Sequence, residues 1–125
     1  MELFDLTIHE LADLLRQKKA SSREITESVF KRIKAVDSKV HAYLSLTEDM
    51  ALAQAKKADE TPAKSPLHGV PLGIKDNFLI EGTKTTCASK ILENYTALQT
   101  LKQKFTTVRV SFRLLAARRK LDPPY

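Results

Sequence analysis

Two neighbouring segments near the start of the chain have apolar residues at helical spacing. Their apolar positions are Ile8, Leu11, Leu14 and Leu15 in residues 7–18, and Ile25, Val29, Ile33 and Val36 in a segment that begins at Ser21 or Ser22. Each segment opens with a Thr or Ser three residues before a Glu, the spacing of a capping box. Because only about three residues separate the segments, we predict a helical hairpin.

The pattern then changes to shorter elements. Residues 40–46 alternate and include Val, Tyr and Leu, which predicts a short strand. Residues 48–59 are rich in Ala and Leu and predict a third helix, with Thr47 as its cap. Residues 70–76 alternate again and predict a strand, in which Pro71 limits pairing. This order of elements is typical of an α/β layer structure.

The charge divides the chain into two parts. Residues 1–95 contain 14 basic and 14 acidic residues, whereas residues 96–125 contain seven basic residues and one acidic residue. The whole formal charge of +6 therefore belongs to the last 30 residues, which also lack glycine. We predict an N-terminal fragment of a domain at 1–95 and a basic tail at 96–125 that is disordered or out of frame.

Several classes of protein are disfavoured. No segment approaches the roughly 18 apolar residues that span a bilayer, and the acidic first residues do not form a secretory signal. The single cysteine, Cys87, cannot form an internal disulfide and suits a reducing cytoplasm. We expect it to be a small, partly buried thiol. The three histidines are scattered without ligand spacing, so we expect no metal site.

The residues with the clearest chemical potential lie between Gly69 and Asn77. Lys75 follows the apolar positions of the predicted strand at 70–76. A partly buried lysine at such a strand end can serve as a general base. The alternative is that the strand ends at Ile74 and Lys75 points into water. Spacing alone favours the solvent alternative.

The run from Gly69 to Asn77 resembles the lysine strand of the amidase-signature family. The resemblance implies that Lys75 is the base of a Ser–cis-Ser–Lys triad that hydrolyses amides, with Asp76 and Asn77 supporting the site. It also implies an α/β fold in which helices cover a mixed sheet. Only the N-terminal part of that fold, with its helical hairpin, would be present in this chain.

The run from Thr85 to Tyr95 is more specific. It is similar to the A-subunit family of glutamyl-tRNA(Gln) amidotransferases. That resemblance implies glutamine hydrolysis and a heterotrimer with B and C subunits. The B subunit would use ATP and magnesium to amidate Glu-tRNA(Gln), so no cofactor is expected in this chain. Thr86 and Ser89 are candidates for the glutamine pocket, although capping or turn roles are equally consistent with their positions.

The resemblance does not continue into residues 96–125. In the family both serines lie downstream, in a Gly/Ser-rich stretch that forms the oxyanion hole, and this chain has no such stretch. We therefore expect the chain alone to be inactive. A frameshift near codon 96 would explain the tail. The alternatives are a small interaction or RNA-binding protein that uses the basic tail, and a fragment of another amidase.

Overall fold

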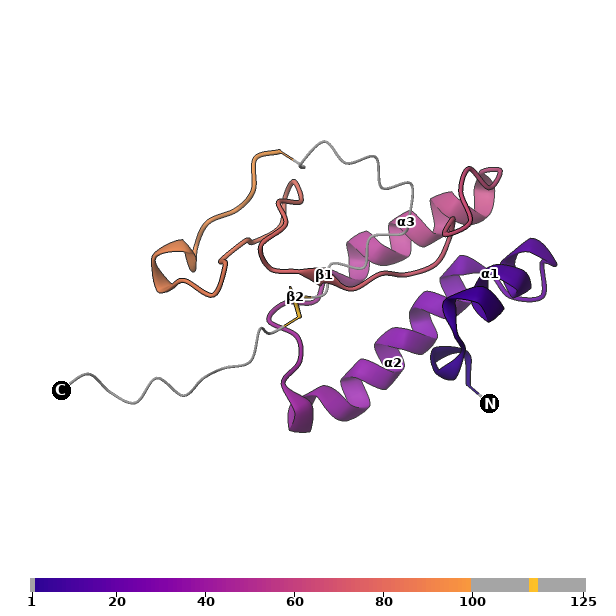
Figure 1. The fold of residues 1–125 in the computed structure, drawn as a ribbon, viewed down its shortest axis with the longest axis horizontal. Coiled ribbons are helices and arrows are strands. Elements are labelled where there is room, and N and C mark those ends of the chain that lie inside the picture. The colour runs from indigo at the N-terminus through magenta and orange to yellow at the C-terminus, as the bar shows by residue number, and fades with distance from the viewer. Residues whose placement is uncertain (1, 100–112, 115–125) are drawn as a thin grey trace.

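A computed structural model of the chain describes residues 2–99 and the backbone of residues 113–114 (Figure 1). Its elements are η1 (Leu3–Asp5), α1 (Ile8–Arg16), α2 (Ser22–Val40), α3 (Glu48–Glu60), β1 (Ile74–Lys75), η2 (Lys90–Leu92) and β2 (Arg113–Leu114). The predictions made for residues 100–112 and 115–125 lie outside the described residues.

Both predicted capping boxes are present at the starts of α1 and α2. The Thr7 backbone N–H donates to Glu10 Oε2 at 2.7 Å, and the Thr7 side chain accepts from the Glu10 N–H. Ser21 and Glu24 repeat the arrangement, with 2.8 Å from the Ser21 N–H to Glu24 Oε2. The donated backbone N–H, and then the hydroxyl, lower the pKa of each glutamate below its usual value.

Helix α2 is the centre of the helical part. Phe30 and Ile33 of α2 pack against Ala51 and Ala55 of α3. Alanine side chains are short, so the two helices can approach closely, and they lie side by side in Figure 1. The other side of the core is a second cluster, formed by Leu11, Ile25 and Val70. This cluster joins α1, the start of α2 and the segment that leads to β1.

The predicted strand at 40–46 is wrong. Helix α2 continues to Val40, and His41 ends it in the left-handed conformation (φ 51°). The Asp37 side chain then accepts the Ala42 N–H at 2.7 Å, which removes a donor that a strand would need. Of the predicted strand, only a single bridge residue at Tyr43 remains.

The third helix and the strand that carries Lys75 both form, with smaller differences from the predictions. Helix α3 begins after Thr47, but the Thr47 side chain makes no capping hydrogen bond. Strand β1 is only two residues long and pairs in parallel with β2, with Ile74 opposite Arg113 and Lys75 opposite Leu114. Residues 70–73 make no strand pairing, as expected around Pro71. None of the helices in the described part is both long and apolar enough to cross a membrane.

Candidate functional site

Lys75 is the last residue of β1, and its side chain is exposed. Among residues 2–99, no ion pair involves Lys75. Its backbone, by contrast, is fixed, because the Phe78 N–H donates to the Lys75 carbonyl at 3.1 Å. Lys75 is thus exposed, as in the solvent-facing alternative, although β1 extends through Lys75 and does not end at Ile74.

The carboxylate of the next residue is buried, in the turn that follows β1. Asp76 is only 7% exposed. Its Oδ1 accepts the Thr86 N–H at 2.8 Å, and its Oδ2 accepts the Thr86 hydroxyl. The Asp76 carbonyl also accepts the Cys87 N–H at 3.3 Å. Asp76 therefore fastens residues 86–87 to the end of β1.

Thr86 belongs to a segment that is itself well connected. The Thr85 N–H donates to the Tyr95 carbonyl at 3.1 Å, and the Ala97 N–H donates to the Thr83 carbonyl at 2.9 Å. These bonds flank an antiparallel bridge between Lys84 and Thr96. These antiparallel contacts hold residues 83–97 together. Asp76 attaches this segment to β1 through Thr86.

Residues 87–89 form a tight turn next to this attachment. Cys87 and Ala88 both have positive φ angles, 49° and 58°, which non-glycine residues seldom adopt. Cys87 is exposed, which corrects the expectation of a partly buried thiol. The Ser89 N–H donates to the Thr86 carbonyl at 2.7 Å, so Ser89 has a turn role here. Asn77 is exposed and follows Asp76 directly.

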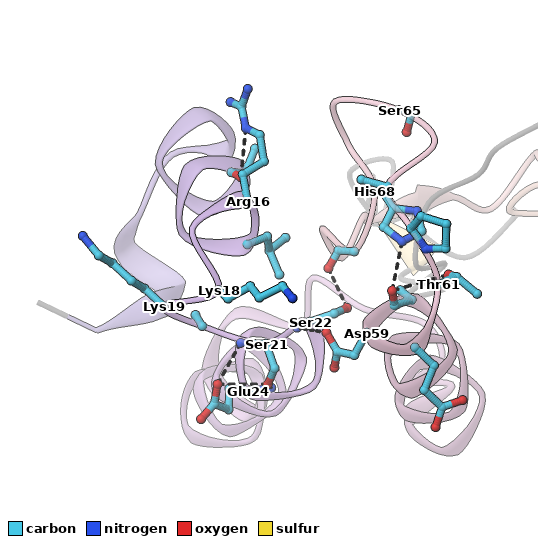
Figure 2. A pocket seen from close by; sticks show the side chains of 18 of the residues that line it. Arg16, Lys18, Lys19, Ser21, Ser22, Glu24, Asp59, Thr61, Ser65 and His68 are labelled. Carbon is cyan, nitrogen blue, oxygen red and sulfur yellow. Dashed lines mark hydrogen bonds between the residues drawn. The ribbon is translucent and has the colours of Figure 1, made fainter.

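A cleft of about 840 Å³ lies between the end of α1, the start of α2 and the end of α3. Arg16, Lys18 and Lys19 lie on one side of it and His68 on the other (Figure 2). The histidine Nε2 is 3.0 Å from the Ala58 carbonyl. No sequence pattern pointed to this cleft.

Two polar residues in the cleft, Asp59 and Ser22, have structural partners. Asp59 of α3 accepts the Ser22 N–H at 2.7 Å and the Arg23 N–H at 3.2 Å, so it caps α2 together with Ser21. The Ser22 hydroxyl donates to the Gly69 carbonyl at 2.7 Å. This bond ties the approach to the lysine strand onto α2 (Figure 2).

Metal-ligating side chains do not gather in the described part of the chain. Among these residues there is no group of three or more His, Cys, Asp or Glu side chains that could hold a metal ion. The region around β1 contains the exposed Lys75 and the buried carboxylate of Asp76, which accepts from Thr86.

Comparison with known proteins assigns the chain to a family. The amidase family model matches residues 24–100. The chain belongs to the amidase family. The matched residues include Lys75, Asp76 and the whole segment that Asp76 attaches.

Curated relatives of this amidase-family chain carry a more specific name. The chain is 52% identical over 98 residues to the A subunit of glutamyl-tRNA(Gln) amidotransferase from Geobacter sp. (strain M21), covering 76% of this chain and 20% of the relative. The protein of the same name from Thermoanaerobacter pseudethanolicus is 51% identical with the same coverage. The chain thus spans about a fifth of the length of these relatives.

The fold is shared with solved amidase structures. Fatty acid amide hydrolase superposes with a TM-score of 0.79, covering 90% of this chain and 21% of the hydrolase. The two sequences are 20% identical, so this likeness concerns the fold alone. The arrangement of helices, lysine strand and attached segment is therefore the opening part of an amidase fold.

Proposed function

We propose that this chain is a fragment of the glutamine-hydrolysing A subunit of a glutamyl-tRNA(Gln) amidotransferase. The observation that carries the proposal is the identity of about one half to A subunits over three quarters of the chain. In this role the complete subunit hydrolyses glutamine and supplies ammonia for converting Glu-tRNA(Gln) to Gln-tRNA(Gln) in translation. B and C subunits are its partners, and the B subunit uses ATP and magnesium.

Lys75 is the base in the proposed reaction. It accepts the proton of a bridging serine, which in turn activates the nucleophilic serine. Both serines belong to a part of the family domain that follows the matched residues. Two features support this role for Lys75: it lies within the residues that the amidase family model matches, and its carbonyl is held by the Phe78 N–H.

A hybrid protein tests this proposal. Residues 1–99 of this chain replace the matching part of the Geobacter sp. (strain M21) relative, and glutamine hydrolysis is measured. Lys75→Ala should reduce kcat by about 10²–10⁴-fold, the usual contribution of a general base. Lys75→Arg should not restore the rate, because a guanidinium stays protonated.

The matched control is Lys84→Ala, since Lys84 is an exposed lysine in the attached segment. It should leave the rate unchanged. An active hybrid whose rate survives Lys75→Ala would remove Lys75 from the mechanism. The 125-residue chain alone should release no ammonia from glutamine above background. Measurable release by the purified chain would contradict the proposed dependence on serines outside it.

A further inference from the structure

We propose that Thr86 is a positioning residue for Lys75, acting through Asp76, and does not contact the substrate. This inference rests on the proposed function, because it concerns how the base of that reaction is held. Thr86 is a candidate for lining the glutamine pocket on sequence grounds. The structure directs both of its hydrogen-bonding donors, the backbone N–H and the hydroxyl, to the Asp76 carboxylate.

The contact acts on the lysine because Asp76 follows it directly in the turn at the end of β1. Strand β1 ends at Lys75, which is exposed, and the buried Asp76 begins the turn that the Phe78 N–H closes on the Lys75 carbonyl. Rotation of the peptide between them would expose the carboxylate and break both bonds from Thr86. The backbone of Lys75 is thus held in place through its neighbour Asp76.

The other bonds around this peptide prevent a compensating movement. The Lys75 carbonyl accepts the Phe78 N–H, and the Asp76 carbonyl accepts the Cys87 N–H. On the far side, Thr85 next to Thr86 is held by Tyr95, and its hydroxyl donates to the Phe78 carbonyl at 3.4 Å. Thr86 therefore connects the lysine to a fixed framework rather than to a free loop.

The first test uses the chain itself. Thr86→Val removes the hydroxyl and keeps the shape, whereas Thr86→Ser keeps the hydroxyl. Amide hydrogen exchange is followed at Phe78 and Cys87. Exchange at both should accelerate by about threefold to tenfold in Thr86→Val, the effect of losing one net hydrogen bond. Exchange in Thr86→Ser should stay near that of the unmodified chain. Unchanged exchange in Thr86→Val would overturn the proposed connection.

The second test separates positioning from substrate binding in the hybrid protein. Thr86→Val should lower kcat by about tenfold with little change in KM, because a misdirected base slows only the chemical step. Thr86→Ser should recover most of the lost rate. A raised KM with unchanged kcat would instead place Thr86 against glutamine and overturn the inference.

Failure of the inference and failure of the proposed function give different results. If Lys75→Ala abolishes hydrolysis while Thr86→Val is as active as the unmodified hybrid, Lys75 is the base but Thr86 does not position it. If the hybrid hydrolyses glutamine equally well with and without Lys75, the proposed function of this segment is wrong. The exchange measurement on the chain alone remains decisive for the Thr86–Asp76 contact in both cases.

Discussion

Two regions of the chain are stabilised by different interactions. They are the helical part, residues 2–70, and the lysine-bearing segment, residues 71–99. The buried apolar residues of the helical part are Leu11, Ala12, Ile25, Phe30, Ile33, Ala51, Ala55 and Val70. Those of the lysine-bearing segment are only Ile80 and Ala97, beside the buried polar residues Asp76, Thr83 and Thr85. Apolar burial dominates the first region, and hydrogen bonds between polar groups dominate the second.

This difference has an energetic consequence. Burying a large apolar side chain stabilises a fold by about 1.5–3 kcal/mol, whereas a typical hydrogen bond contributes a net stabilisation of about 0.5–1.5 kcal/mol. The lysine-bearing segment also leaves Ile91 94% exposed and Leu98 85% exposed. We therefore expect the helical part to be the more stable region and the lysine-bearing segment to open first. Its hydrogen bonds provide direction for the lysine more than stability for the chain.

The largest effect is expected from Phe30→Ala. Phe30 is 1% exposed between α2 and α3, so the substitution removes the largest of the fully buried side chains in residues 2–99 and leaves a cavity. The loss should be about 3–5 kcal/mol of unfolding free energy. Urea unfolding followed by helical circular dichroism measures it.

Phe78→Ala is the matched control in the lysine-bearing segment, since Phe78 is 42% exposed. It should shift the urea midpoint far less than Phe30→Ala does. Equal shifts for the two variants would mean that the two regions share one source of stability. The proposed difference between a region stabilised by apolar burial and a region stabilised by hydrogen bonds would then be wrong.

Alanine substitution at two glycines provides a second comparison between the regions, with a smaller expected effect on stability. Gly69 and Gly82 have similar positive φ angles, 81° and 76°. Alanine at either position should cost about 1–2 kcal/mol for the left-handed backbone. An added Cβ at Gly69 would also lie 3.3 Å from Leu15 Cδ1 and 3.3 Å from Ser22 Cβ, whereas nothing lies within 4 Å at Gly82.

Gly69→Ala should therefore destabilise the helical part more than Gly82→Ala does, by about 1 kcal/mol or more from overpacking. Thermal unfolding of the two variants measures the difference, and the common backbone cost cancels. A smaller effect at Gly69 than at Gly82 would show that the approach to the lysine strand is not packed tightly onto α2.

The elements that the sequence predicts well are those with local causes. Both capping boxes join residues three positions apart, so their spacing is visible in the chain. The predicted strand at 40–46 does not form because the Asp37 carboxylate takes the Ala42 N–H, a competition that alternation does not reveal. The family resemblance points to Lys75 from the sequence, but its exposure is visible only in the structure.

Contacts between distant residues account for most of what could not be predicted. Asp59 caps α2 from 37 positions away, and no pattern around Asp59 indicates a partner. Thr86 stands out in the sequence because it lies in a run that resembles a family, but its contact with Asp76 spans ten positions and involves a side chain. Such pairs depend on how the connecting segment folds, which single-sequence periodicity does not determine.

The smallest predicted effect concerns acid. The pKa values of Glu10 and Glu24 are lowered, so the folded chain binds fewer protons than the unfolded chain just below about pH 4.3, the usual glutamate pKa. Their contribution to stability is complete above that pH and is lost as the pH falls through the lowered pKa values. Glu24→Gln keeps an acceptor for the Ser21 N–H but cannot be protonated in this range.

The loss of the helical circular dichroism signal with falling pH should therefore be less steep in Glu24→Gln. Stability at neutral pH should be near that of the unmodified chain. Glu93→Gln lies in the lysine-bearing segment and caps no α-helix, so its helical signal should follow the unmodified chain. If both variants reduce the loss of helical signal at low pH equally, the acid response belongs to the whole chain and not to the capping boxes. If only Glu24→Gln does so, the acid response belongs to the capping boxes of the helical part and not to the lysine-bearing segment.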